Sequence, residues 1–520
     1  FQAEDGIRDL VRSRGLGDVY KRQSKEILDL VEFERPPSIV YDDNKNFMLF
    51  LFRDNYKSIS ELSAKELRLG GLRIDPKTNI GSRVTYYNNV KIRNLKNQKS
   101  EITQVEGLPK NPKLSNISWS PNQKRIALTN TTETGVELWV LELESGSVTK
   151  LTEPNLNSNI GSVINWFADS ENMLVKMISN NRKSLIDTNQ IIPDGPTIST
   201  NFGEKAQNRT YQDLLKNKFD EHNFEQLSTS AIFKVSIDGS VKKWMDDGMY
   251  RTISFSPNGE YVMISQINKP FSYLVTYSRF PTETNVYSKD GNFISNLLNV
   301  PLIEELPKGF MSVRTGKRSF SWRPDKGASL TYVTALDSGD PSKKVDFRDE
   351  VYELNYPFLG QGKFILKTIN RFSGIDWGTK DMAIAYDTWW NTRNRKSYVF
   401  NPSNPNIKPK IISDRNYQDT YSDPGVFLRS RNEFNRSVLK MHYGNVFLRG
   451  QGFSPNGQFP FIDKVNTKTF EKTRVYQSSY TDKIESIIDY DPKKNELTVS
   501  IESPSEYPNY YIKKNKFWET

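Results

Sequence analysis

Residues 254–264 read SFSPNGEYVMI, and this stretch is one copy of a phrase that the chain repeats. Residues 118–128 (SWSPNQKRIAL) and 321–333 (SWRPDKGASLTYV) follow the same order. Each copy predicts a strand that ends at an aromatic residue, a turn at Pro-Asn or Pro-Asp, and a second β-rich strand. A hairpin that recurs roughly every 50 residues is typical of a β-propeller, in which each repeat supplies one blade.

Weaker copies of the phrase extend the series. They lie at residues 165–169, 376–378 and 489–492, and an early copy runs from 38 to 50. The interval from Trp166 to Phe255 is long enough for one blade with a large insertion, and that from Trp377 to Tyr490 is long enough for two blades. The hairpin missing from the second interval is expected between residues 425–427 and 437–439. The series therefore predicts an all-β fold, a β-propeller of seven or eight blades.

Composition excludes several classes of site. The chain has no cysteine, which rules out disulfides and thiolate catalysis, and its two histidines, His222 and His442, are too few for a histidine-rich metal centre. We therefore expect no metal and no cofactor. No run of about 18 apolar residues occurs, so we expect no membrane span. The net charge of +10 is spread among 62 acidic residues without a long basic run, which favours a solvated surface over nucleic-acid binding.

The first 23 residues, FQAEDGIRDLVRSRGLGDVYKRQ, differ from the rest of the chain. They have neither the periodicity of a helix or strand nor the apolar core of a signal peptide. They resemble translated sequencing-adapter sequence, so we expect residues 1–23 to be a non-native leader and the natural N-terminus to be missing. We therefore leave the cellular compartment open, with a periplasmic or secreted location expected if the source is bacterial.

Two helical insertions are expected between the strands. Ser58 and Glu61 have the spacing of a capping box, with apolar residues up to Leu69 and a stop at Gly70-Gly71. A second helix is expected to begin at a Thr210 cap, with Asp213 three positions on, and to continue through residues 219–227. Such insertions either form a binding surface at one rim of a propeller or fill a gap between blades.

Motifs for catalysis are absent from the sequence. No Gly-x-Ser-x-Gly pentapeptide, Walker loop, dinucleotide fingerprint or His-Glu-x-x-His occurs. His222 stands among solvating residues, and His442 alternates with apolar neighbours as a strand residue does. The carboxylate pairs Asp246-Asp247 and Glu304-Glu305 are adjacent in sequence and would point apart on a strand. The sequence therefore predicts no catalytic residue in this chain.

Several strings along the chain resemble the glutamyl endopeptidases, a branch of the prolyl oligopeptidase family of serine peptidases. In chain order these are residues 66–79 (ELRLGGLRIDPKTN) with Ser82-Arg83, 209–216 (RTYQDLLK), 270–273 (PFSY) with 279–281 (RFP), 316–319 (GKRS) with 322–326 (WRPDK), 421–425 (YSDPG) and 502–511 (ESPSEYPNYY). The resemblance implies an N-terminal propeller that covers a C-terminal α/β-hydrolase domain, which carries the catalytic Ser, Asp and His.

After the expected leader at 1–23, the resemblance implies a propeller at 24–511 and the start of a connection to a hydrolase domain at 512–520. A hydrolase domain needs on the order of 200 residues, so no catalytic residue can be carried over to this chain and its own enzymatic activity stays uncertain. The expected function is that of the substrate-gating propeller of a glutamate-directed serine endopeptidase. Its partners would be peptide substrates that reach the hydrolase domain, and its oligomeric state is undetermined.

A glutamate side chain at the cleaved position needs a cation beside it. Arg209 on the second insertion, and Arg393 and Arg395 after Trp389-Trp390, are candidate substrate-binding residues. The alternative for each is a salt bridge between blades. Two other functions remain open for the whole chain: a stand-alone propeller scaffold that binds proteins or peptides, and a basic surface that binds polyanions.

Overall fold

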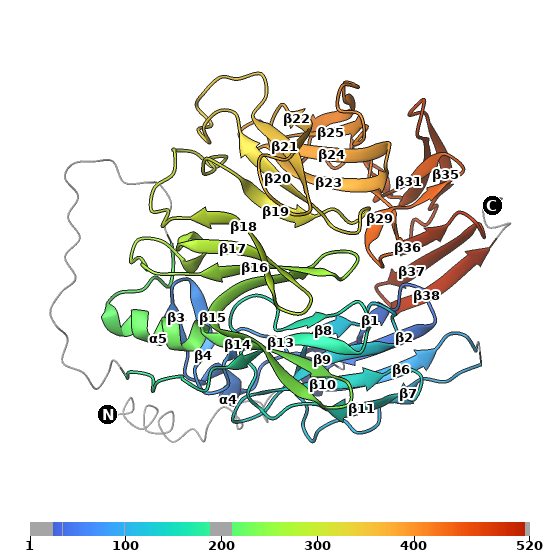
Figure 1. Cartoon of the computed structure of the whole chain (residues 1–520). Helices are drawn as coiled ribbons and strands as arrows, with labels where there is room; N and C mark the ends of the chain where they lie inside the picture. Colours follow the sequence, from blue (N-terminus) through green and yellow to red (C-terminus); the bar gives the residue numbers. More distant parts are fainter. Residues whose placement is uncertain (1–23, 34, 98, 188–210, 515–520) are drawn as a thin grey trace, which may run out of the picture.

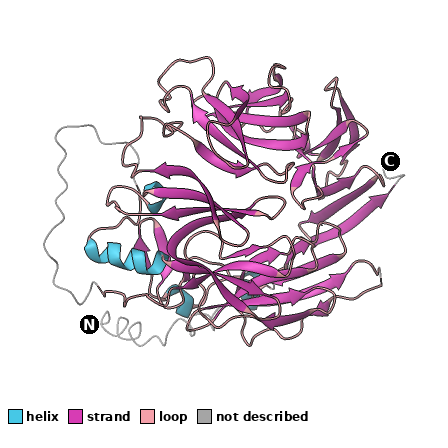
Figure 2. Ribbon diagram, in the orientation of Figure 1, coloured by secondary structure: helices cyan, strands magenta, loops and turns pink. Residues whose placement is uncertain are grey.

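The computed structural model describes residues 24–33, 35–97, 99–187 and 211–514. Strands make up nearly all of the regular structure in these residues, and every strand pair of the named sheets is antiparallel. The few helices lie at the edge of the strand-rich body (Figures 1 and 2). The all-β fold class predicted from the repeated phrase is confirmed.

The sheets follow the chain in order, and each is named here by its first strand. The β1 sheet contains β1 (Ser38–Tyr41), β2 (Phe47–Phe52), β6 (Asn89–Asn94) and β7 (Thr103–Gln104). The β8 sheet contains β8 (Leu114–Trp119), β9 (Arg125–Thr131), β10 (Val136–Glu142) and β11 (Ser147–Lys150). The seven-stranded β12 sheet contains β12 (Ile164–Trp166), β13 (Asn172–Ile178), β14 (Ser230–Ser236), β15 (Val241–Phe255), β16 (Tyr261–Ile267), β17 (Thr282–Ser288) and β18 (Phe293–Val300).

The second half of the chain continues in the same way. The β19 sheet contains β19 (Arg318–Trp322), β20 (Ser329–Ala335), β21 (Asp349–Asn355) and β22 (Lys363–Thr368), and the β23 sheet contains β23 (Arg371–Thr379), β24 (Met382–Trp389), β25 (Asn394–Phe400) and β26 (Lys410–Asn416). The β27 sheet contains β27 (Val426–Phe427), β31 (Asn445–Gly450), β34 (Phe461–Asn466) and β35 (Lys472–Gln477), with β30 (Met441–His442) on β31. The β36 sheet contains β36 (Ile484–Asp491), β37 (Glu496–Ser503) and β38 (Glu506–Lys514).

Short strands and helices lie outside these sheets. They are the strands β3 (Leu67–Leu69), β4 (Leu72–Asp75) and β5 (Ile80–Gly81), the hairpins β28 (Arg429–Arg431) with β29 (Ser437–Leu439) and β32 (Phe453–Ser454) with β33 (Gly457–Gln458), and the helices α3 (Lys25–Val31), α4 (Ile59–Leu62), α5 (Lys218–Ser228) and η2 (Tyr277–Arg279).

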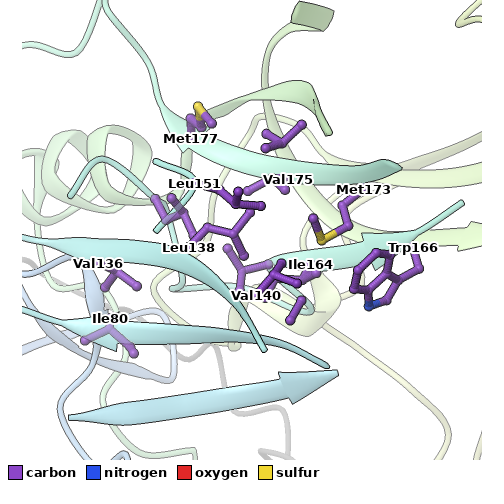
Figure 3. Packing of buried hydrophobic residues seen from close by; sticks show 14 residues of the cluster. Ile80, Val136, Leu138, Val140, Leu151, Ile164, Trp166, Met173, Val175 and Met177 are labelled. Carbon is purple, nitrogen blue, oxygen red and sulfur yellow. The ribbon is translucent and has the colours of Figure 1, made fainter. Parts of the chain in front are cut away.

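Apolar side chains join each sheet to the next one along the chain. Strand β9 is an example. Because side chains alternate between the two faces of a strand, Ala127 packs toward the β12 sheet, whereas Ile126 and Leu128 pack toward the β1 sheet. Figure 3 shows the first of these two layers, where Leu138 and Val140 of the β8 sheet meet residues of β12 and β13. Because most strands are covered on both faces, they read as continuous apolar runs, and burying these runs on both sides drives the stacking of sheet on sheet.

The stack of sheets closes into a ring. The last sheet meets the first one, where the rings of Tyr510 and Tyr41 lie 5.6 Å apart and Lys45 Nζ lies 2.9 Å from Asp489. The series of sheets from β1 to β36 thus returns to its start, as a propeller requires. The number of blades stays a prediction. The long strand β15 joins the two halves of the seven-stranded β12 sheet, so this sheet can be counted as one blade or as two.

The repeated phrase forms the same turn in its two strongest copies. Ser256 Oγ donates to Asn258 Oδ1 at 2.7 Å and accepts from the Tyr261 amide at 3.0 Å. Ser120 and Asn122 make the equivalent bond at 2.8 Å, and Ser120 Oγ accepts from the Arg125 amide. In this way the side chains supply the hydrogen bonds that fix the end of one strand and the start of the next.

The aromatic residue of the phrase fastens one sheet to its neighbour. Trp166 Nε1 donates to the Ser118 carbonyl of the preceding sheet at 3.1 Å. Trp322 Nε1 donates to the Ser254 carbonyl at 3.0 Å in the same way. Each indole thus buries a large apolar surface while its single polar group finds a partner. The early copy at 38–50 and the three weaker copies also form strands β1–β2, β12, β23 and β36, as expected.

Three expectations about local structure are wrong. Helix α4 has the predicted capping box but ends at Leu62, because Leu67–Leu69 is strand β3 and Gly70-Gly71, both at positive φ, form the turn into β4. Helix α5 begins at Lys218 with Asn217 as its cap, whereas Thr210 lies outside the described residues. The hairpin expected from 425 to 439 is not one ladder, since β27 pairs with β31 while β28 pairs with β29.

Helix α5 and the hairpin β3–β4 pack together on the β12 sheet. Phe224 and Leu227 of α5 are fully buried beside Leu69 of β3 and Ile267 of β16. The insertions thus cover one side of this sheet. The expected boundary between propeller and connection, at Tyr511, falls inside β38.

Candidate functional site

A large cavity lies where the two ends of the ring meet. Its volume is about 2100 Å³, and residues of the β1, β23, β27 and β36 sheets line it. The repeated phrase positions part of its wall, because the turn after β1 (Asp42 to Lys45) and the turn after β36 (Asp491 to Lys494) both face it. Segments far apart in the sequence therefore share one partly enclosed space.

Cations outnumber carboxylates on the cavity wall. Some of these cations are paired: Arg431 Nε lies 2.7 Å from Asp43, Arg415 lies 3.0 Å from Asp423, and Arg429 pairs with Asp376. Others have no carboxylate within ion-pair distance among the described residues; these are Arg395, Lys410, Arg449, Lys472, Lys493 and Lys494. The cavity is therefore electropositive and can hold anionic groups.

Arg395 is the sequence-predicted residue that the structure places in this cavity. It lies on β25 with its guanidinium 4.8 Å from the centre of the Tyr386 ring. The Tyr386 hydroxyl donates to Asp376 at 2.8 Å, and burial and this carboxylate raise the pKa of the phenol. Tyr386 therefore stays a neutral hydrogen-bond donor, and Arg395 rests on its ring with a charge that no carboxylate of the described residues neutralises.

The other two candidate residues do not join Arg395. Arg393 sits in the turn between β24 and β25 at positive φ, stacks 3.8 Å from the centre of the Trp390 ring and donates to the Trp390 carbonyl at 2.7 Å. It does not line the cavity. Arg209 lies outside the described residues. Within the described chain neither Arg393 nor Arg395 makes an ion pair, so the alternative of a salt bridge between blades finds no partner for either.

One partly buried carboxylate on the cavity wall organises the junction between the last sheet and the first. Asp489 of β36 accepts from Lys440 Nζ at 2.5 Å and pairs with Lys45 Nζ at 2.9 Å. Burial by itself would raise the pKa of Asp489, but the two ammonium groups outweigh it and lower the pKa. A single carboxylate thus joins the β1, β27 and β36 sheets.

The two histidines of the chain do not line the cavity, and His222 lies on α5 with Nε2 3.0 Å from the Ser184 carbonyl. Across the described residues no three His, Asp or Glu side chains are arranged to hold a metal ion, and no helix there is long and apolar enough to cross a membrane. The arrangement is suited to hold anionic groups.

Sequence reasoning missed most of the cavity cations. Lys410, Lys472 and Lys493 come from three different sheets and are separated by long stretches of chain. One local signal was present: Lys493 and Lys494 directly follow the Asp-Pro turn of a repeated phrase, and such turns lie at one end of the ring. The others are brought together only by closure of the ring.

Two curated plant proteins match the chain along nearly its whole length. The probable glutamyl endopeptidase, chloroplastic, of Oryza sativa subsp. japonica is 32% identical over 521 residues, which cover 95% of this chain and 55% of that protein. The protein of the same name from Arabidopsis thaliana is 30% identical over 525 residues, which cover 96% and 54%. No family model matches the chain.

Solved structures were also compared with the chain. Dipeptidyl peptidase 4 of Porphyromonas gingivalis gives a TM-score of 0.44 at 10% identity, covering 95% of this chain and 60% of that one. A prolyl endopeptidase gives 0.40 at 12% identity, covering 84% and 53%. In sequence the chain is similar to the probable glutamyl endopeptidases along nearly its whole length, and it spans about half the length of these curated relatives.

Proposed function

We propose that this chain is the substrate-gating propeller of a prolyl oligopeptidase-family serine endopeptidase that is directed to glutamate. In this proposal residues 24–511 form the propeller, and the part of the relatives that the chain does not span carries the catalytic Ser, Asp and His. The observation that carries the proposal is the electropositive cavity of about 2100 Å³, in which several cations lack a carboxylate partner. The similarity to the probable glutamyl endopeptidases supports the peptidase assignment.

The chemistry of the cavity fits an acidic peptide. A carboxylate that reaches Arg395 or Lys410 gains a charge-assisted hydrogen bond without first breaking an existing ion pair. A field of one sign in a partly enclosed space also raises the local concentration of ligands of opposite charge. A ring of sheets above a hydrolase site would admit extended peptides and exclude folded proteins and bulk water.

Peptide binding to the purified chain tests the proposal. A labelled decapeptide with several glutamates should bind more tightly than the same peptide with glutamines, and the difference should shrink as salt is raised. Arg395→Gln should weaken binding of the glutamate peptide about two- to tenfold, the range for one partly exposed charge contact, and leave the glutamine peptide unchanged. Fluorescence anisotropy measures both.

Arg393→Gln is the matched control, because Arg393 lies on the same hairpin but outside the cavity. Equal binding of the two wild-type peptides, or an equal loss in both variants, would contradict the assignment of the cavity. Peptide cleavage by the purified chain that a serine-directed reagent blocks would contradict the gating role, because it would place the catalytic centre within these residues.

A further inference from the structure

The hairpin β28–β29 leaves the sheet from which it comes. The strands before and after it in sequence, β27 and β30, both pair with β31, whereas β28 and β29 pair only as a hairpin of their own. Its loop runs from Asn432 to Arg436, with Asn435 at positive φ and the Asn432 side chain accepting from two loop amides. The hairpin is therefore a well-formed local unit that does not belong to a blade.

The tip of the hairpin binds turns of three other parts of the ring. Arg431 Nε lies 2.7 Å from Asp43 in the turn after β1. Asn432 Nδ2 donates to the Pro324 carbonyl at 2.7 Å, in the turn after β19. Arg436 donates to the carbonyls of Phe255 and Ser256, in the turn after β15, at 3.0 and 3.2 Å. All three are turns of the repeated phrase.

The order of the sheets shows where the hairpin runs. Between the β27 sheet and the turn after β15 lie the β19 and β23 sheets, and between the β27 sheet and the β1 sheet lies the β36 sheet. A hairpin that leaves the β27 sheet and contacts both the turn after β1 and the turn after β15 must therefore cross the space that the ring surrounds. In Figure 1, β29 lies on the inner side of its neighbouring sheets, toward the centre of the molecule.

The base of the hairpin and its tip are held by different forces. At the base, Leu428 and Leu439 are buried in the apolar layers on either side of the β27 sheet. At the tip, none of the residues from Arg431 to Arg436 is buried, and the Arg431 and Asp43 side chains are 45% and 38% exposed. The Arg431–Asp43 pair is therefore the contact of the tip that breaks at the lowest free-energy cost, whereas the hydrogen bonds of Asn432 and Arg436 to backbone carbonyls are partly buried and the base stays fixed.

We propose that residues 429–439 form a hinged plug across one mouth of the ring, and that the carboxylates of an acidic peptide release it by replacing Asp43 at Arg431. The second half rests on the proposed function, since the same peptide would enter the cavity that Arg429, Ser430 and Arg431 line. Release exchanges one carboxylate for another at an exposed guanidinium, so it needs no other change in charge.

Distance measurements between spin labels test the plug. The chain has no cysteine, so Glu433→Cys at the exposed tip and Lys124→Cys at the exposed turn after β8 give two unique attachment sites. We expect a narrow short-distance population and a minor, broader long-distance one. Asp43→Asn or Arg431→Gln should raise the ratio of long to short about two- to fivefold, as should high salt, because each weakens one exposed ion pair.

The matched control is Glu506→Gln, which breaks the Lys483–Glu506 pair of similar exposure at the far side of the β36 sheet and should change nothing. Unchanged melting temperatures would show that the variants fold. A single distance population that neither variant nor salt alters would overturn the plug.

Addition of the glutamate decapeptide separates this proposal from the one before it. The peptide should raise the long-distance population, and the glutamine peptide at equal ionic strength should not. Binding of the glutamate peptide with no change in distance would overturn release by carboxylates while the proposed function stands. Opening in Asp43→Asn with no peptide binding would overturn the proposed function and leave the plug.

Discussion

At the scale of single residues, Lys176 is the most unusual side chain of the ring. It lies in β13, is 2% exposed, and donates its ammonium proton to the Ile160 carbonyl. Burial lowers its pKa to about 7, far below the value of a solvated lysine. Leu174, two positions earlier and therefore on the same face of the strand, belongs to an apolar layer, so the position resembles a core site.

This residue predicts how stability changes with pH. Because the folded-state pKa is depressed, the unfolded chain binds more protons between about pH 7 and 10, and the free energy of unfolding should rise with pH across that window. Lys176→Met should flatten this rise and add about 1–4 kcal/mol at pH 7, as apolar replacement of a buried charge does. Urea unfolding at pH 7 and 9.5 measures both. A steeper pH dependence in the variant would contradict the argument.

At the scale of elements, the turn of the repeated phrase depends on a buried serine hydroxyl. Ser256 is fully buried, and its Oγ is the partner of the Tyr261 amide at the start of β16. Ser256→Ala should therefore leave a buried amide without an acceptor and cost about 1–3 kcal/mol. Ser240→Ala, at an exposed turn position, is the control and should cost less than about 0.5 kcal/mol. Calorimetric melting compares them, and equal losses would contradict this role for the turn.

Features whose interacting residues are close together in the sequence could be predicted, whereas features whose residues are far apart could not. The turns at Ser120 and Ser256 were predictable because all their hydrogen bonds form within six residues. The first helix is predicted too long, because a Gly-Gly pair such as Gly70-Gly71 can form the turn of a hairpin as readily as the end of a helix. The partner of β27 was missed because β31 lies beyond an inserted hairpin. Arg395 was found by residue type, but its neighbours Lys410 and Lys472 in the cavity depend on closure of the ring.

At the scale of the whole molecule, one carboxylate holds three sheets together. Asp489 binds Lys45 and Lys440, and these lysines also donate to the Thr498 hydroxyl and to the Tyr490 carbonyl, at 3.0 and 2.9 Å. The junction between the last sheet and the first therefore depends on charge as well as on the contact between Tyr41 and Tyr510. This makes ring closure sensitive to acid.

Asp489→Asn should open this junction selectively. It leaves two ammonium groups facing a neutral amide and should lower the free energy of unfolding at pH 7 by about 1–3 kcal/mol, a partly buried pair being worth more than an exposed one. Because the pKa of Asp489 is lowered in the folded state, its contribution is complete above about pH 4 and is lost as the pH falls below that value. The difference in free energy of unfolding between wild type and variant should therefore stay constant above about pH 4 and shrink as the pH falls to 3. The control Glu144→Gln, which breaks the exposed Lys96–Glu144 pair, should cost less than about 0.5 kcal/mol at either pH. Urea unfolding of the three proteins decides the matter, because a difference that persists at pH 3 would assign the loss to packing instead of charge.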